Sequence, residues 1–128
     1  MKNYFFWILL LVVFGGGAVF LFWPKAPAKG NYDDFAKCLS SKDAVMYGAY
    51  WCPHCQNEKK SFGDSFRFVN YIECTQETGK CLTEKINGYP TWIFPASSAG
   101  GPDGKRFEGE MGLERLSRES GCLLDNKN

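Results

Sequence analysis

The sequence predicts an α/β protein in which one small domain, a four-stranded mixed sheet with helices on both faces, is preceded by one transmembrane helix. Segments with strand character alternate with amphipathic segments along residues 31–128. An uncharged apolar run fills residues 4–23. The length of 128 residues allows one small domain and an appendage.

The apolar run has the length of a membrane anchor. Residues 4–23 read YFFWILLLVVFGGGAVFLFW, and a helix needs about 20 apolar residues to cross the hydrocarbon core of a bilayer. Secretory signal regions are shorter, although Ala26-Pro27-Ala28 resembles a cleavage site. We therefore expect an uncleaved anchor in preference to a removed signal. Residues 1–3 are then a cytoplasmic amino terminus, and residues 24–30, with two prolines, an extended linker.

The cysteine content indicates the side of the membrane. Lysines flank the apolar run at both ends, so the distribution of positive charge barely discriminates between the two orientations. Six cysteines in 128 residues favour an oxidising compartment. We expect a single pass through the cytoplasmic or inner membrane, with the domain on the extracytoplasmic side, periplasmic or extracellular. The formal net charge of +1 gives no reason to expect nucleic acid as a partner.

The first elements of the domain surround a pair of cysteines. Residues 31–41 space Phe35, Cys38 and Leu39 on one face, as in a short amphipathic helix. Residues 44–50 are apolar, aromatic and small, which predicts a buried strand, and residues 56–60 are good helix formers. Strand, tight turn and helix therefore meet at Cys52 and Cys55.

Five further elements follow this junction. Residues 68–74 are apolar and β-branched, as in a second strand, and residues 81–87 predict a helix stopped by Gly88. Residues 91–95 and 105–110 predict a third strand and an antiparallel fourth, separated by a turn cluster at residues 100–104. Residues 113–120 close the domain as an amphipathic helix before Gly121.

The motif Cys52-Pro53-His54-Cys55 places two thiols where a helix begins. Unpaired N–H groups and the positive end of the helix dipole stabilise a thiolate there. Pro53 suits the first helical position, and a protonated His54 adds positive charge beside Cys52. The thiolate is the species that attacks or leaves in disulfide exchange, so redox activity is the favoured interpretation.

A zinc half-site and a merely structural disulfide are the alternatives for this motif. A zinc site needs four ligands, but the only histidine already lies inside the motif and the other cysteines are spread out singly. No metal and no cofactor are therefore expected.

Longer motifs carry a resemblance to a known family. WCPHC after an apolar strand, with GYPTW at residues 88–92, resembles the thioredoxin superfamily. Together with FAKCL, NYIEC and a closing SGC, it is similar to the thioredoxin-like domain associated with bacterial vitamin K epoxide reductase homologues, with a Dsb-type Cys-Pro-His-Cys active site. The resemblance covers residues 33–122. It implies a thioredoxin-like fold and thiol–disulfide exchange, with Cys52 as the exposed nucleophile and Cys55 as its resolving partner.

The same resemblance implies a substrate site around Pro90. Without the resemblance, the residues around Pro90 predict only a proline at the start of an edge strand. In the family that the chain resembles, the corresponding proline forms a cis peptide bond that faces the redox pair. A cis bond presents the backbone of Tyr89 to an incoming substrate strand, so that main-chain hydrogen bonds hold the mixed disulfide. The expected substrate-binding residues are Trp51, Tyr89, Pro90 and Thr91.

One position departs from the family pattern. Thioredoxins carry a buried acid on the central strand, which helps to move the proton of the resolving thiol, whereas the aligned residue here is Met46. No acid occurs between Asp43 and Glu58. The proton of Cys55 then moves through water, through Glu58 or without a dedicated base, and the sequence leaves these alternatives open.

The four cysteines outside the motif allow three connectivities. Cys74 leaves a strand and Cys81 opens the next helix, so a local bridge between them is sterically easy. Cys38 and Cys122 belong to the first and last helices, which a closed domain can bring together. The hypothesis is therefore two structural disulfides, Cys38–Cys122 and Cys74–Cys81, against free buried thiols. A rival hypothesis is that Cys74–Cys81 relays electrons to the motif pair.

These features predict a membrane-anchored, extracytoplasmic thiol–disulfide oxidoreductase that introduces disulfides. The expected partners are protein thiols and disulfides, the membrane through residues 4–23, and, as the resemblance implies, a vitamin K epoxide reductase-like or other quinone-linked membrane protein that reoxidises the pair. A disulfide reductase or isomerase is the alternative among enzymes. A non-catalytic chaperone or peptide-binding module is the alternative outside them.

Overall fold

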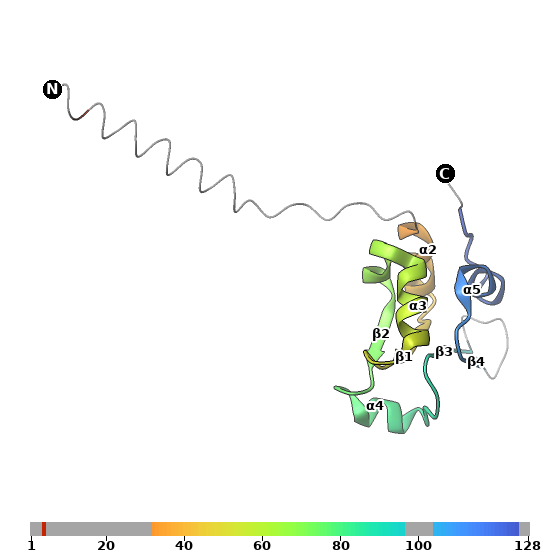
Figure 1. The fold of residues 1–128 in the computed structure, drawn as a ribbon. Helices are drawn as coiled ribbons and strands as arrows, with labels where there is room; N and C mark the ends of the chain where they lie inside the picture. Colours follow the sequence, from red (N-terminus) through yellow and green to blue (C-terminus); the bar gives the residue numbers. More distant parts are fainter. Residues whose placement is uncertain (1–3, 5–31, 97–103, 126–128) are drawn as a thin grey trace.

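The computed structural model describes Tyr4, residues 32–96 and residues 104–125. Residues 1–3, the rest of the apolar run at 4–23, the linker at 24–30 and most of the turn cluster at 100–104 lie outside these ranges, so what was expected there stays a prediction. In the described ranges, no helix has both the length and the apolar character that a bilayer crossing requires. The described part is the expected domain, with helices gathered around a small sheet (Figure 1).

Four short strands form one mixed sheet in the order β2-β1-β3-β4. They are β1 (Val45–Gly48), β2 (Asn70–Glu73), β3 (Thr91–Phe94) and β4 (Lys105–Glu108). β1 runs parallel to β2 and antiparallel to β3, and β3 pairs antiparallel with β4. The predicted four-stranded mixed sheet, with its antiparallel third and fourth strands, is confirmed.

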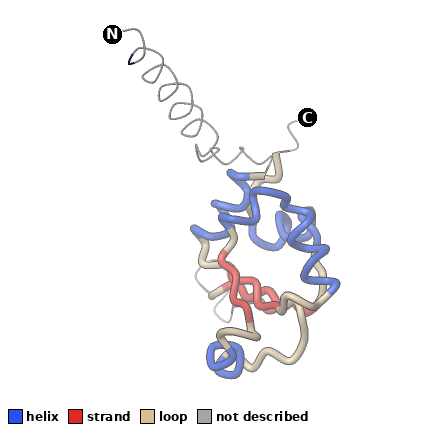
Figure 2. Tube along the Cα trace, turned by 60° about the vertical axis from the view of Figure 1, so that its left-hand side comes forward, coloured by secondary structure: helices blue, strands red, loops and turns tan. Residues whose placement is uncertain are grey.

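Helices cover both faces of the sheet. They are α2 (Asp33–Ser41), α3 (Pro53–Phe62), the 3-10 helix η1 (Gly63–Phe68), α4 (Thr78–Thr83) and α5 (Gly112–Ser120). Met46 and Trp92, paired across β1 and β3, pack in the larger core with apolar side chains of α2, α3 and α5. Tyr47 points to the opposite face, as successive strand residues do, and packs with Cys74 and Cys81 beside α4. Figure 2 shows the strands between α4 and the other helices.

Two elements differ from the prediction. The helix expected at residues 81–87 is α4, which starts and ends earlier, because Lys85 adopts a positive φ of 52° that a continuing helix does not allow. Gly88 therefore lies beyond the helix end and does not stop it. The helix η1 was not predicted, and it occupies the chain just before β2, so the second strand is shorter than residues 68–74.

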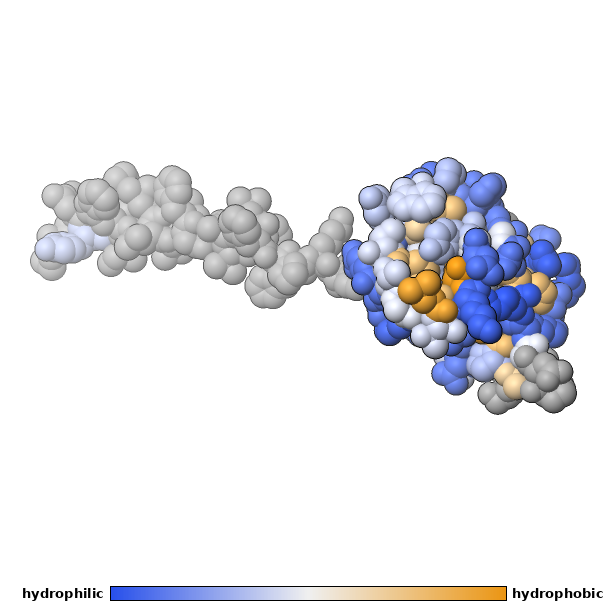
Figure 3. All heavy atoms as spheres, turned by 90° about the horizontal axis from the view of Figure 1, so that it is seen from below, coloured by the Kyte–Doolittle hydropathy of each residue, from blue (hydrophilic) through white to orange (hydrophobic). Residues whose placement is uncertain are grey.

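The surface on the α4 side is largely hydrophilic, with apolar atoms gathered in a small area near its middle (Figure 3). The exposed apolar side chain of α4 is Leu82. Two larger exposed side chains, Tyr50 and Trp51, belong to the turn between β1 and α3. The exposed aromatic surface of the described domain thus includes the turn that carries the cysteine motif.

Candidate active site

The cysteine motif lies at the junction of β1 and α3. β1 ends at Gly48, and the Cys52 N–H bonds back to the Ala49 carbonyl at 3.0 Å, which turns the chain toward the helix. Cys52 is the N-cap of α3, Pro53 follows at the helix start, and the Gln56 N–H donates to the Cys52 carbonyl at 3.1 Å. Both cysteines of the motif are free thiols. The predicted meeting of strand, turn and helix at the motif is confirmed.

Cys52 is not exposed, which corrects the expectation for the nucleophile. The residue is 5% exposed and belongs to the larger core, where its Sγ donates toward the Tyr89 carbonyl at 3.6 Å. The side chain at the N-cap therefore turns inward, toward the segment that precedes β3. Trp51, which is 57% exposed, contacts Tyr89 edge to face with ring centroids 6.0 Å apart. The thiol therefore lies in the core beside the backbone of Tyr89, and the ring of Tyr89 contacts the exposed ring of Trp51.

Cys55 is fully buried in the first turn of α3. Burial raises the pKa of its thiol to about 12, and contact with Cys52 adds to this rise. A hydrogen bond from the Ala49 backbone and the positive charge of Lys59 lower the pKa and oppose the rise in part. Cys55 therefore keeps its proton at neutral pH, which suits the second thiol of an exchange rather than the first. A Cβ at Gly48 would lie 2.9 Å from Cys55 Sγ, so the absence of a side chain there leaves room for the sulfur.

His54 faces a carboxylate that the sequence did not single out. Its Nδ1 lies 3.1 Å from Glu110 Oε2, and the Asn57 side-chain amide donates to the same oxygen at 3.4 Å. Glu110 comes from the segment between β4 and α5, far from the motif in sequence. The ring that was expected to bring a positive charge to Cys52 is therefore also in contact with the carboxylate of Glu110.

Glu58 on α3 holds the start of α5. The residue is fully buried, and its carboxylate accepts hydrogen bonds from Met111 N at 3.0 Å and from Gly112 N at 3.2 Å. Burial raises the pKa of Glu58, while these two N–H donors oppose the rise. In the same segment, the Gly109 N–H donates to the Pro90 carbonyl at 2.7 Å. The carboxylate that was one candidate for moving the proton of the resolving thiol is thus engaged by α5.

The Tyr89–Pro90 peptide bond is cis. The hydrogen bond from the Cys52 thiol to the Tyr89 carbonyl brings the segment that contains Tyr89 and Pro90 to the side of Cys52, and Trp51 contacts the ring of Tyr89. Thr91 differs from the expectation: its side chain is fully buried, and its hydroxyl donates to the backbone of the preceding turn at 2.8 Å. Its side chain therefore holds the turn before β3 and is closed off from the surface.

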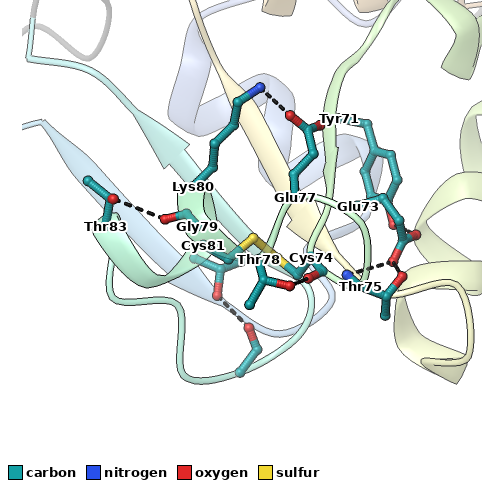
Figure 4. The surroundings of a disulfide bond; sticks show 12 residues. Tyr71, Glu73, Cys74, Thr75, Glu77, Thr78, Gly79, Lys80, Cys81 and Thr83 are labelled. Carbon is teal, nitrogen blue, oxygen red and sulfur yellow. Dashed lines mark hydrogen bonds and ion pairs between the residues drawn. A yellow bond between two sulfur atoms is a disulfide. The ribbon is translucent and has the colours of Figure 1, made fainter.

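The other four cysteines form two disulfides, with the pairing expected from the sequence: Cys38–Cys122 and Cys74–Cys81. Cys74–Cys81 links the end of β2 to α4, beside the ion pair of Lys80 and Glu77 (Figure 4). It packs with Tyr47 in the smaller core, whereas the motif cysteines belong to the larger core on the opposite face of the sheet. This separation argues against a direct relay of electrons between the two pairs.

A metal site finds no support in the part of the chain that the structure describes. There, no three side chains of His, Cys, Asp or Glu gather in an arrangement that could hold a metal ion. The ring of His54 is bound to Glu110. A zinc site at the motif thus lacks further ligands within residues 32–96 and 104–125.

The fold and the site together define a thioredoxin-like α/β protein with a Cys-X-X-Cys pair. The crystal structure of chloroplastic thioredoxin z matches with a TM-score of 0.52 and 20% sequence identity, over 68% of this chain and 84% of that one, which shows the shared fold.

One similar protein is the thiol-disulfide oxidoreductase LTO1 of Arabidopsis thaliana: an alignment of 102 residues is 36% identical and covers 73% of this chain. The aligned part is 25% of LTO1, so the chain spans about a quarter of that relative. No family profile matches the chain.

Proposed function

We propose that the chain is a thiol–disulfide oxidoreductase with Cys52 and Cys55 as its redox pair. The observation that carries the proposal is the geometry of the motif. Two free thiols in contact stand at the start of α3, one recessed beside the cis Tyr89–Pro90 bond and the other fully buried. The similarity to LTO1, whose name gives this activity, supports the proposal.

The proposed reaction is thiol–disulfide exchange at Cys52. In the oxidising direction, a substrate thiolate attacks Cys52 Sγ of the closed pair, and Cys55 leaves. A second substrate thiolate then displaces Cys52 and completes the substrate disulfide. The backbone of Tyr89 lies at the rim of the site, where it can pair with the main chain of a substrate segment. Main-chain pairing tolerates many substrate sequences, which suits an enzyme that acts on unrelated proteins.

The proposed setting is the extracytoplasmic face of the cytoplasmic or inner membrane. Residues 4–23 serve as the anchor, and a vitamin K epoxide reductase-like or other quinone-linked membrane protein reoxidises the pair. Three features support this setting: the uncharged length of the run, the resemblance of the motifs, and the two disulfides of the described domain, since such bonds persist in oxidising compartments.

The test of the activity compares the full chain with its Cys52→Ser variant during refolding of a reduced substrate protein in a glutathione buffer. The wild-type chain is expected to accelerate the appearance of correctly paired substrate, and the variant to lose that effect. Equal activity of the two would overturn the proposal. It would favour a holding role, for which Tyr50 and Trp51 offer exposed aromatic surface.

The reduction potential separates an oxidase from a reductase or isomerase. Strongly oxidising pairs lie at about −120 mV and thioredoxin at about −270 mV. Pro53 and His54 between the cysteines resemble the former, so a potential nearer the first value is expected, with the pair mostly oxidised when trapped by alkylation in cells. A potential near the second value, with the pair mostly reduced, would assign the chain to the reductases or isomerases.

A further inference from the structure

Cys55 must carry a negative charge at one point of the proposed exchange, although it is fully buried. The substrate thiolate forms a bond to Cys52 Sγ, the Cys52–Cys55 bond breaks, and Cys55 leaves with the electron pair as a thiolate, which then takes up a proton from water. Burial opposes this charge, as the raised pKa of Cys55 shows. Met46 has no proton to give, and the Glu58 carboxylate is engaged by the start of α5, so neither of them offsets the negative charge on the sulfur.

Lys59 is placed to supply that charge. It lies four residues after Cys55 on α3, and residues with this spacing are neighbours on one face of a helix. Its Nζ stands 3.6 Å from the ring centroid of Tyr71 and 5.5 Å from that of Phe66, and an ammonium over an aromatic face is attracted by the ring quadrupole. Lys59 takes part in none of the ion pairs formed within the described residues, so no contacting carboxylate cancels its charge there.

The ring of Tyr71 brings the ammonium to the side of the sulfur. Tyr71 lies on β2 opposite Met46 of β1 and packs against the larger core. A Cβ at Gly48 would lie 2.9 Å from Cys55 Sγ, 3.1 Å from Tyr71 Cε2 and 3.3 Å from Tyr71 Oη, so ring and sulfur are neighbours around the bare glycine. The hydroxyl of Tyr71 donates to Glu73 Oε2 at 2.6 Å, which fixes the ring from its far end (Figure 4).

We propose that Lys59, held on the ring of Tyr71, is the counter-charge that stabilises the Cys55 thiolate while the disulfide opens. The inference rests on the exchange reaction proposed above. Charges attract more strongly across a protein interior than across water, and Lys59 does lower the pKa of Cys55 against the effect of burial. Because Cys55 is protonated in the resting reduced pair, the charge acts on the transition state. Lys59 therefore speeds the opening of the disulfide without making the pair a stronger oxidant.

The test uses the full chain with the motif pair oxidised, and measures two quantities: the rate of its reduction by glutathione, and its equilibrium potential in a glutathione buffer. Lys59→Met keeps the length of the side chain and removes its charge, so the rate is expected to fall roughly three- to tenfold, as for the loss of one nearby, partly screened charge, at an unchanged potential. Lys59→Arg keeps the charge and the aromatic contact and is expected to stay close to the wild-type rate. Lys60→Met, at the exposed neighbouring position, is the matched control and should change neither quantity.

Several outcomes would overturn the inference. One is a Lys59→Met variant that glutathione reduces as fast as wild type. Another is a Lys59→Arg variant that is reduced as slowly as Lys59→Met, because the shape of the side chain and not its charge would then determine the rate. Equal slowing by Lys60→Met, or a shift in potential large enough to explain the slowing, would overturn it too. If Lys59→Met unfolds more easily than wild type, Lys59→Gln takes its place with the same expectation. Failure of the proposed function would look different, since the wild-type pair itself would then not react with glutathione.

Discussion

A single missing side chain determines how closely the resolving thiol is packed. Gly48 ends β1 on the face of the larger core, where an added Cβ would meet Cys55 Sγ and the ring of Tyr71. The conformation of Gly48 does not require glycine, since its φ is not positive. The close approach of the sulfur requires it, because cores packed to this density have no room for an added methyl group.

Gly48→Ala is therefore expected to destabilise the reduced protein by about 1–3 kcal/mol, the usual cost of overpacking a core. Gly79→Ala is the matched control, because a Cβ there meets no atom within 4 Å and the position lies in α4. It should be neutral or stabilising by up to about 1 kcal/mol. Urea unfolding of both variants measures the difference, and a Gly48→Ala variant as stable as wild type would show that Cys55 can move aside.

At the scale of elements, a buried carboxylate joins the active-site helix to the last helix. Glu58 on α3 receives the N–H groups of Met111 and Gly112, two of the donors that the start of α5 leaves without an intrahelical partner. The adjacent Glu110 binds His54, and Gly109 binds Pro90. The segment 109–112 thus ties three parts of the site together, and its position depends on Glu58.

The raised pKa of Glu58 predicts how stability changes with pH. The folded protein binds the Glu58 proton more tightly than the unfolded chain does, so this residue's contribution to the free energy of unfolding is full below the ordinary Glu pKa. That contribution falls as pH rises from there through the raised pKa. Replacing Glu58 with Gln should remove this decline, measured as urea unfolding at a series of pH values.

Glu114→Gln, an exposed change in the first turn of α5, is the control for this experiment and should keep the decline. If the Glu58→Gln variant loses stability with pH as steeply as wild type does, another group causes the dependence.

At the scale of the whole molecule, one disulfide closes nearly the entire described domain into a ring. Cys38 and Cys122 are separated by 84 positions, whereas Cys74 and Cys81 are separated by 7. A cross-link removes more entropy from the unfolded chain when the ring it closes is longer. The long bond, which joins α2 to the segment after α5, is therefore expected to stabilise the fold more than the short one.

Replacing both Cys38 and Cys122 with Ala should lower the free energy of unfolding by about 4–5 kcal/mol, and replacing both Cys74 and Cys81 by about 2.5 kcal/mol. Urea unfolding under non-reducing conditions compares the two double variants. A larger loss from the short bond than from the long one would show that local packing around α4 outweighs the entropy of the unfolded chain.

Most features that the sequence predicted have short-range signals; the pairing of Cys38 with Cys122, 84 positions apart, is the exception and was inferred from the order of the elements. The position of Cys52 and Cys55 at a helix start follows from neighbouring residues, and the apolar and β-branched composition of the strand segments predicted the sheet. The pairing of Cys74 with Cys81 needed only their proximity along the chain. The bounds of α4 were wrong because residues 78–80 lack apolar periodicity and include a glycine, so nothing marked them as helical.

The features that the sequence did not predict depend on contacts between distant segments. The partnership of His54 with Glu110 depends on where the segment after β4 lies, and that of Lys59 with Tyr71 on the register of β1 against β2. The burial of Cys52 results from the inward turn of its side chain toward Tyr89. No residue pattern reports such distances, although an unpaired lysine one turn after a buried cysteine is a signal worth examining in similar motifs.

The Cys38–Cys122 bond also determines the path of mechanical load through the molecule. A pulling force applied to one residue before Cys38 and one residue after Cys122 passes through this disulfide, because the disulfide is the shortest covalent connection between the two points. All four strands and the cysteine motif lie inside the closed ring and bear none of that tension. Pulling on two such residues can therefore not separate the strands of the sheet until a reductant has cleaved the Cys38–Cys122 disulfide.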